Sequence, residues 1–297
     1  MNTSAALSGF GKHSRKSIRP NEMTLSVFRL LTDHARRSLK AVAGFKLFGF
    51  DWLRPWISYS FSPLLNRFLS KKTVRFGRFN VRRGECDLYT FANIFEDYRP
   101  DLVWRALQDV DLVVDLGANV GAFSFLVTTL CQRAGWKRVI RAVEPNRRNV
   151  DFLRQQPFAE SLDIREAAVG PTEGEARLSR GENSVTDRVD FSSTDDNKVR
   201  LISLESLCDQ PALVKMDIEG GEWEILRHGL PANVQYLFLE WHRDPTTERL
   251  LEPSDLIRGD WKRHSGDLYG STMWTFTRCA PRDTSIPETP VAIEQRT

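Results

Sequence analysis

Acidic side chains end several short apolar runs of this sequence, and a histidine follows one of them. Asp115 and Glu144 each close a run rich in valine, and Asp217 closes a third. Glu219 and His242 come soon after the later runs. Carboxylates and imidazoles can take up protons, and carboxylates also hold ammonium groups and hydroxyls. If the runs are strands of one parallel sheet, their carboxyl ends meet at one edge and bring these groups together.

The first of these runs continues into a glycine-containing turn. Residues 113–121 read Val-Val-Asp-Leu-Gly-Ala-Asn-Val-Gly, and an apolar run that can form a helix follows. The spacing Gly-x-x-x-Gly differs from the dinucleotide fingerprint Gly-x-Gly-x-x-Gly, and an acid at the strand end would repel a pyrophosphate. It suits a ligand with an ammonium group and hydroxyls, such as S-adenosylmethionine (SAM). The alternative is a strand, turn and helix whose glycines serve close packing.

Two further segments extend this pattern. Residues 139–146 indicate a second strand ending at Glu144, a position whose carboxylate accepts hydrogen bonds from ribose hydroxyls; the carboxylate also suits a helix start. Residues 162–169 indicate a third strand, in which Ala168 leaves room for an adenine ring or simply allows close packing. The predicted cofactor-binding residues are Asp115, Gly117, Asn119, Gly121, Glu144 and Ala168.

The most distinctive stretch is residues 213–226, where a short buried strand ends at Asp217 and a helix starts near Glu222. Residues 236–242 predict the next strand, and its alternation places Glu240 and His242 on one face at the same edge. A histidine after a strand can be an ordinary solvated residue or a catalyst.

The order of these motifs resembles the FkbM family of SAM-dependent methyltransferases. The similarity spans roughly residues 90–245, and the segment Lys-x-Asp-x-Glu-Gly-x-Glu at 215–222 is the part most particular to that family. One departure is Glu205, where family members commonly carry an aspartate. The resemblance implies a Rossmann-like sheet, SAM as methyl donor, and O-methylation of a hydroxyl on a sugar, glycan or secondary metabolite.

The resemblance also implies roles for the acidic cluster. SAM carries an activated methyl group, so the protein mainly supplies alignment and a base. The candidates for orienting or deprotonating the hydroxyl are Asp217, Glu219, Glu222 and His242. Asp217 could equally hold the SAM amino group. We expect no metal ligand set, although an oxygen-rich cluster can suit Mg²⁺. The alternative function is a non-catalytic SAM-binding sensor or scaffold that engages a membrane or partner through its N-terminal segment.

These features predict an α/β protein with a Rossmann-like class I methyltransferase sheet, mostly parallel with an antiparallel C-terminal edge, and a helical N-terminal extension. The expected parts are a basic extension (1–72), the methyltransferase domain (73–279) and a flexible tail (280–297). Within the domain, 171–212 is an insertion that we interpret as extra strands and a candidate lid. Residues 246–259 look helical, and 267–277 look like a hairpin around Gly270.

Charge is distributed unevenly along the 297 residues. Residues 1–72 carry a net charge of +10, whereas the whole chain carries +3. We favour a helical cap with a solvated basic face over a helix that contacts an anionic membrane peripherally. We expect no nucleic-acid partner, because no base-reading module is evident. The four cysteines form no Cys-x-x-Cys pair, so we expect reduced thiols and a cytoplasmic protein. The alternative localisation is the cytoplasmic side of a membrane, bound peripherally.

Overall fold

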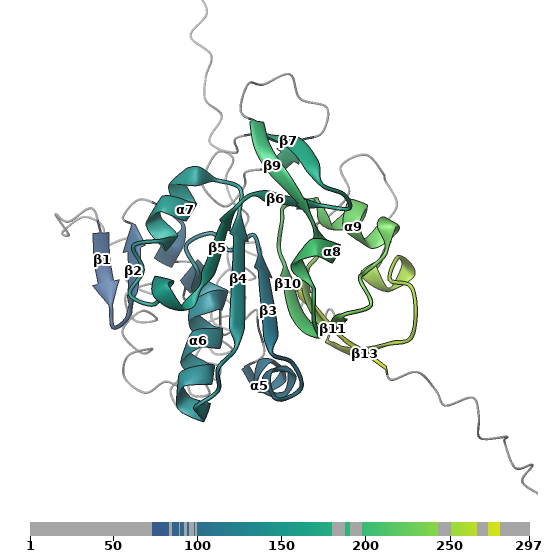
Figure 1. The fold of residues 1–297 in the computed structure, drawn as a ribbon, viewed down its shortest axis with the longest axis horizontal. Coiled ribbons are helices and arrows are strands. Elements are labelled where there is room, and N and C mark those ends of the chain that lie inside the picture. The colour runs from purple at the N-terminus through teal and green to yellow at the C-terminus, as the bar shows by residue number, and fades with distance from the viewer. Residues whose placement is uncertain are drawn as a thin grey trace, which may run out of the picture.

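A seven-stranded, largely parallel sheet forms the centre of the protein (Figure 1). The computed structural model describes residues 73–179, 188–190, 198–242, 251–265 and 273–279, apart from 83–84, 89, 92–93, 95–97 and 99. In spatial order the sheet consists of β12 (Trp261–Ser265), β13 (Met273–Arg278), β11 (Val234–Glu240), β10 (Ala212–Met216), β3 (Leu112–Leu116), β4 (Val139–Glu144) and β5 (Asp163–Glu166). The five strands from β11 to β5 pair in parallel, and β13 and β12 add antiparallel strands at one edge. This arrangement confirms the predicted fold class for the described residues.

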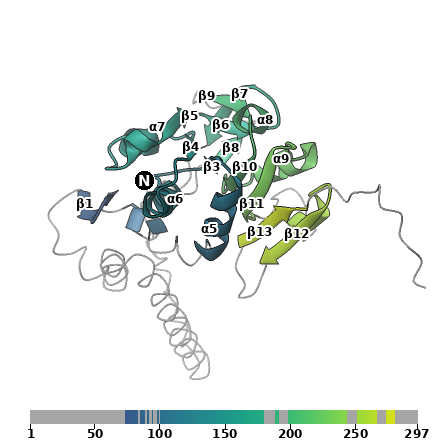
Figure 2. The ribbon, with the colours of Figure 1, turned by 60° about the horizontal axis from the view of Figure 1, so that its bottom comes forward.

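Both faces of the sheet are covered, because its central strands are apolar on both sides. Every residue of β3 and β10 is buried, as expected for parallel strands between two helical layers. Alternate residues of β3 enter different cores: Val113 packs with helices α5 (Pro100–Asp109) and α6 (Ala122–Ala134), and Val114 packs with α8 (Leu204–Leu207) and α9 (Glu222–His228). Figure 2 shows α5 and α6 together on one side of the sheet.

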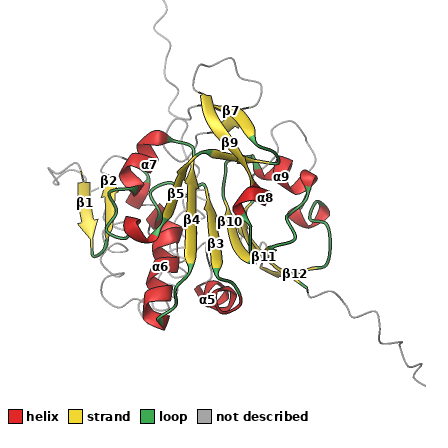
Figure 3. Ribbon diagram, viewed as in Figure 1, coloured by secondary structure: helices red, strands yellow, loops and turns green. Residues whose placement is uncertain are grey.

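The remaining short elements flank this core. A hairpin of β1 (Thr73–Phe76) and β2 (Phe79–Arg82) lies beside α6, and Phe79 is buried against Phe158 and Phe91. Helix α7 (Arg147–Leu153) follows β4, and the 3₁₀ turn η1 (Ala159–Ser161) precedes β5. Figure 3 shows the helices in red beside the strands of the central sheet in yellow.

A second, smaller sheet lies beyond the carboxyl ends of β4 and β5 (Figure 1). Its order is β6 (Ala168–Gly170), β9 (Lys198–Ser203), β7 (Gly174–Ser179) and β8 (Arg188–Asp190). The prediction of one strand over 162–169 is therefore wrong. The chain leaves β4 after Ala167 and pairs with β9 instead, because Ala168 finds its apolar partners in that sheet. The extra strands predicted within 171–212 are confirmed, whereas the lid stays a prediction.

Two predictions near the C-terminus need correction. Residues 251–259 contain only a 3₁₀ turn, η2 (Pro253–Asp255), where we predicted a helix over 246–259, and residues 243–250 lie outside the described residues. Pro253 begins this turn and Gly259 has a φ of 95°, and both residues disfavour a continued α-helix. The antiparallel edge is confirmed, but the partner of β13 is β12, which precedes the predicted hairpin, and Gly270 lies outside the described residues.

The predicted extension (1–72) and tail (280–297) also lie outside the described residues. Among the described residues, no helix is long and apolar enough to cross a membrane. All four cysteines are free thiols.

Candidate functional site

The turn between β3 and α6, residues 117–121, is built from backbone conformations that are rare for most residues. Gly117, Asn119 and Gly121 all have positive φ, at 69°, 50° and 89°. Asn119 has a side chain, so its left-handed conformation is the unusual one of the three, and such strain gathers at functional sites. We call residues 117–121 the cofactor loop.

Both glycines of the cofactor loop are packed against other parts of the protein. A Cβ atom on Gly117 would lie 1.8 Å from the backbone oxygen of Asp217, and one on Gly121 would lie 2.4 Å from Leu153 Cδ1. The close-packing interpretation therefore explains the two glycines. Because Gly117 has no side chain, the backbone of the loop after β10 can pack directly against the cofactor loop.

Asp115 lies one residue before the end of β3 and is completely buried. Its Oδ2 accepts hydrogen bonds from the backbone N (3.1 Å) and the Oγ (2.7 Å) of Ser124, which anchors the first turn of α6. Its Oδ1 is buried without a hydrogen-bond partner, although Lys215 Nζ lies 3.4 Å away. Asp115 thus anchors the start of α6 behind the cofactor loop, and its Oδ1 can still accept a hydrogen bond.

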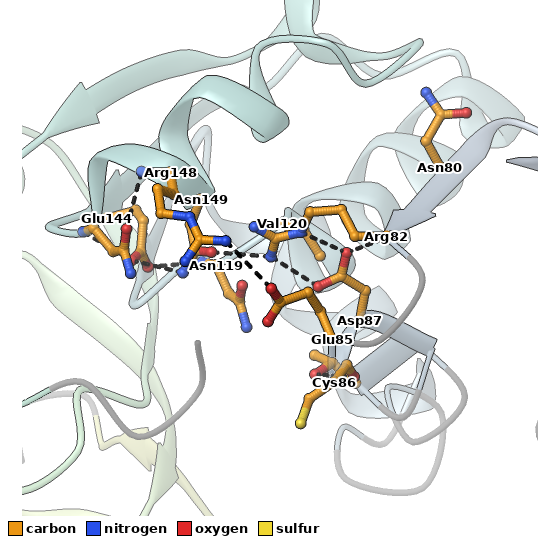
Figure 4. Close-up of polar contacts among 12 residues, drawn as sticks. Asn80, Arg82, Glu85, Cys86, Asp87, Asn119, Val120, Glu144, Arg148 and Asn149 are labelled. Atoms are coloured by element: carbon orange, nitrogen blue, oxygen red, sulfur yellow. Dashed lines mark hydrogen bonds and ion pairs between the residues drawn. The ribbon is translucent and has the colours of Figure 1, made fainter. Parts of the chain in front are cut away.

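Glu144, at the end of β4, supports the other side of the cofactor loop (Figure 4). Its carboxylate accepts hydrogen bonds from Asn119 N (2.9 Å), Asn146 N (3.0 Å) and Asn149 Nδ2 (3.2 Å). Burial raises the pKa of the Glu144 carboxyl, and these three donors partly oppose the effect. A carboxylate offers about four acceptor positions, so one remains for a further donor.

Lys215 links the cofactor loop to Asp217 in the loop after β10. It was not among the predicted site residues. Its Nζ donates to the carbonyl oxygens of Leu116 (3.0 Å) and Gly117 (2.8 Å) and lies 3.5 Å from Asp217 Oδ2. Burial lowers the pKa of Lys215, but the surrounding acids, Asp217 first, outweigh burial and raise it. A lysine within an otherwise apolar buried strand was the available signal, because a buried ammonium needs such partners.

The predicted acidic cluster, which we define as Asp217, Glu219, Glu222 and His242, comes from three places: Asp217 and Glu219 lie in the loop after β10, Glu222 begins α9, and His242 follows β11. Glu219 has a φ of 54°, so it is a second non-glycine residue, after Asn119, in the left-handed conformation. Glu222 is completely buried and accepts from the backbone N of Ile218 (3.0 Å) and of Gly220 (2.8 Å). These two hydrogen bonds fix the turn and orient the Glu222 carboxylate so that it also contacts the imidazole of His242.

His242 is fixed by contacts on both its backbone and its ring. Its Nδ1 lies 3.0 Å from Glu222 Oε1, and its carbonyl accepts a hydrogen bond from Trp223 Nε1 (2.8 Å). Its Nε2 lies 3.6 Å from Glu219 Oε2 and 3.9 Å from Glu240 Oε1. Burial lowers the pKa of the imidazole, but the hydrogen bond and charge of Glu222, followed by the charges of Glu219 and Asp217, raise it to about 9.

The ligand atoms of Asp217, Glu240 and His242 all lie within 4.8 Å of one another, a spacing at which a divalent cation could be held. The hydrogen bond and charge of Glu222 raise the pKa of this imidazole to about 9, so a cation at neutral pH would have to displace a proton from His242.

The aromatic neighbours of the site belong to the core: Trp223 and Trp274 are buried, and Trp223 packs on Trp241.

The structure thus unites most of the predicted site residues along one sheet edge. The backbone N of Asp217 donates to the Leu116 carbonyl (3.3 Å), which joins the acidic cluster to the cofactor loop. Ala168 is the exception, since it packs with Ala176 and Leu201 inside the small sheet. Glu205 lies exposed on α8.

The site offers acceptors of the kind that SAM requires. Among the described residues, the buried side-chain oxygens without a hydrogen-bond partner are Asp115 Oδ1, just before the cofactor loop, and Asn119 Oδ1, within it. Glu144 adds the remaining acceptor position described above. Unpaired buried acceptors are costly, so such atoms call for donors, and the ammonium, ribose hydroxyls and exocyclic amine of SAM are donors.

Comparison with known proteins gave a family match and several similar structures, two of which are described below. The family model for the methyltransferase FkbM domain matches residues 115–258. A methyltransferase FkbM from Methylobacillus flagellatus is 15% identical, with a TM-score of 0.36 over 64% of this chain and 53% of that one. A proposed RNA methyltransferase from Pyrococcus horikoshii is 13% identical, with a TM-score of 0.34 over 73% of this chain and 96% of that one.

The chain therefore spans about half the length of the first of these structures. Similarity this low adds nothing to the fold, which rests on the sheet order and register. A search among curated protein sequences returned no match.

Proposed function

Because residues 115–258 belong to the methyltransferase FkbM family, we propose that the protein transfers a methyl group from SAM to a hydroxyl oxygen of a sugar, glycan or secondary metabolite. The observation that carries the O-methylation proposal is the direct contact between the cofactor loop and the acidic cluster. The Cβ position of Gly117 lies against the backbone of Asp217, so the first residue of the acidic cluster lies directly beside the first residue of the cofactor loop.

The cofactor side of the site is assigned to four groups. Glu144 and Asn119 would accept donors from the adenosine half of SAM, and Asp115 with its Lys215 partner would meet the charged methionine half. When bound, SAM supplies the activated methyl group. The role of the protein residues is then to align the acceptor and to manage one proton.

The proton balance defines what the acidic cluster must do. As the oxygen–methyl bond forms and the sulfur–methyl bond breaks, the hydroxyl loses its proton to a base. The carboxylates of Asp217 and Glu219 are 27% and 23% exposed, so they can reach an acceptor. His242 is held by Glu222 and would orient the hydroxyl or the carboxylates beside it.

The direct test is transfer of a labelled methyl group from SAM by the purified full-length protein to fractionated cell extract. Labelled product that survives mild base identifies an ether rather than an ester. Asp217→Asn should leave the affinity for S-adenosylhomocysteine within about twofold, since it removes no cofactor acceptor. The same change should lower turnover by about 10²–10⁴-fold, the effect of losing a positioned base.

Glu224→Gln is the matched control, because Glu224 lies exposed on α9 two residues beyond Glu222. It should retain full turnover. Equal turnover in Asp217→Asn and wild type would remove Asp217 from the proposal, and label found only on amines would exclude O-methylation. Binding of SAM without transfer to any fraction would favour the sensor or scaffold alternative.

A further inference from the structure

A chain of buried polar contacts runs from the N-terminal hairpin to the cofactor loop (Figure 4). Asp87 is completely buried and accepts from Arg82 Nε (2.9 Å), Arg82 Nη2 (2.8 Å) and the backbone N of Arg82 (2.7 Å). Arg82 Nη2 also donates to Asn149 Oδ1 (3.0 Å). Asn149 is 1% exposed, and its Nδ2 donates to Glu144 Oε1.

Each contact in this chain fixes the direction of the next. Asp87 holds the arginine by two side-chain bonds, so its guanidinium has one orientation. An arginine only donates, which forces the Asn149 side-chain oxygen towards Arg82 and its NH₂ group towards Glu144. The amide therefore presents a donor, not an acceptor, to the carboxylate.

The hairpin end of this chain lies outside the family match, which starts at residue 115. The match thus covers Asn149 and Glu144 but neither Arg82 nor Asp87. The Arg82 guanidinium also lies 5.0 Å from the centre of the Phe152 ring on α7, the helix that carries Asn149. The hairpin is consequently docked on the helix next to Glu144.

We propose that Arg82 and Asn149 are positioning residues that hold the Glu144 carboxylate for hydrogen bonding to the ribose hydroxyls of the cofactor. This inference rests on the proposed function. The donors Asn119 N and Asn146 N come from the backbone on two sides, and Asn149 supplies the third point that stops the carboxylate from turning. Without it, burial favours protonation of Glu144, and a protonated acid is a poorer acceptor.

The probes for this role are S-adenosylhomocysteine and its 2′,3′-dideoxy analogue, with binding measured by calorimetry on the full-length protein. Wild type should bind the hydroxyl-bearing probe more tightly, by about ten- to a hundredfold, the value of hydrogen bonds to a charged group. Asn149→Leu should lose most of this preference. Its affinity for the dideoxy analogue should stay within about twofold of wild type.

Gln156→Leu is the matched control for loss of a buried amide bridge. Gln156 is 4% exposed and likewise joins the hairpin to the cofactor-loop side, with Nε2 bonded to the carbonyls of Asn80 (2.9 Å) and Val120 (3.1 Å). It leaves the three donors of Glu144 in place. Gln156→Leu should therefore keep the preference for the hydroxyl-bearing probe even where its stability falls as much as that of Asn149→Leu.

Asn149→Asp covers the case in which Asn149→Leu fails to fold. Its carboxylate keeps a partner in Arg82 but faces Glu144 with a like charge, so affinity for S-adenosylhomocysteine should fall at least as far. A full hydroxyl preference in a folded Asn149 variant, or an equal loss in Gln156→Leu, would overturn the positioning role alone. Failure of wild type to bind S-adenosylhomocysteine would overturn the proposed function together with this inference.

Discussion

Replacing Glu222 by glutamine should lower the pKa of His242, because Glu222 is the first cause that raises it. The Glu222 carboxylate is completely buried and lies 3.0 Å from His242 Nδ1. An opposite charge this close typically shifts a pKa by 1–3 units, so the His242 pKa should fall from about 9 to roughly 6–8. That change corresponds to about 1.4–4 kcal/mol less stabilisation of the imidazolium.

The same interaction has a defined effect on stability. The folded pKa of His242 lies above the unfolded value of about 6.5, so its contribution is fully present below pH 6.5 and is lost as the pH rises through about 9. The free energy of unfolding of wild type should therefore decline over pH 6.5–9, relative to His242→Gln, by on the order of 3 kcal/mol. Glu222→Gln should remove most of that decline.

An NMR titration of the imidazole Cε1–Hε1 signals measures the pKa directly, since the chain has five histidines and His242→Gln identifies the relevant signal. Denaturant unfolding at pH 6, 7.5 and 9 measures the stability. Glu224→Gln, an exposed change on the same helix, should move neither quantity. A wild-type His242 pKa at or below 6.5, or one that Glu222→Gln leaves in place, would refute the electrostatic reasoning.

Four other outcomes follow from the geometry. Gly117→Ala should destabilise by several kcal/mol more than Gly135→Ala in chemical denaturation, because both glycines have a φ of 69° but only Gly117 has a backbone atom at its Cβ position; equal losses would contradict the packing. Lys215→Met should cost about 3–5 kcal/mol of unfolding free energy by leaving Asp115 buried and uncompensated, whereas Lys198→Met, which breaks an exposed pair, should cost about 0–1 kcal/mol. Treatment with EDTA should leave methyl transfer unchanged, since a metal ion would have to displace the proton that Glu222 and Glu219 stabilise on His242; a loss reversed by Mn²⁺ would instead assign Asp217, Glu240 and His242 as ligands. Sedimentation with anionic liposomes should be equally weak with and without residues 1–72 if the extension is a cap, and binding that depends on 1–72 would favour the membrane-surface helix.

The sequence was a good guide to the sheet because buried parallel strands leave continuous apolar runs. It located β3, β4, β10 and β11 and the acids at their ends, since a run of valine and leucine needs no knowledge of its neighbours. It failed at 162–169, where the boundary between β5 and β6 depends on which strand lies alongside. It also failed at 251–259, where Pro253 begins a 3₁₀ turn and no α-helix forms.

Side-chain roles were harder to predict than positions. Asp115 was expected to face a ligand, yet most of its capacity serves Ser124 and Lys215 beneath the loop. Spacing along a strand tells where a residue stands, but not which partners its carboxylate will find. Asn149 carried no signal at all, because its importance depends on Arg82, a residue 67 positions away in the sequence.

The two sequence motifs are best understood as one structural unit. Gly117 must lack a side chain because the Asp217 carbonyl occupies that space, and the Asp217 N–H bonds to the Leu116 carbonyl. Lys215 completes the joint by donating to the carbonyls of Leu116 and Gly117. The cofactor loop and the loop after β10 thus shape each other, and a change that disrupts their packing at Gly117 or Lys215 should disturb both cofactor binding and proton transfer. Mutations at Gly117 and Lys215 should therefore be non-additive in stability, with a coupling of about 0.5–3 kcal/mol, while either paired with Lys198→Met should add independently.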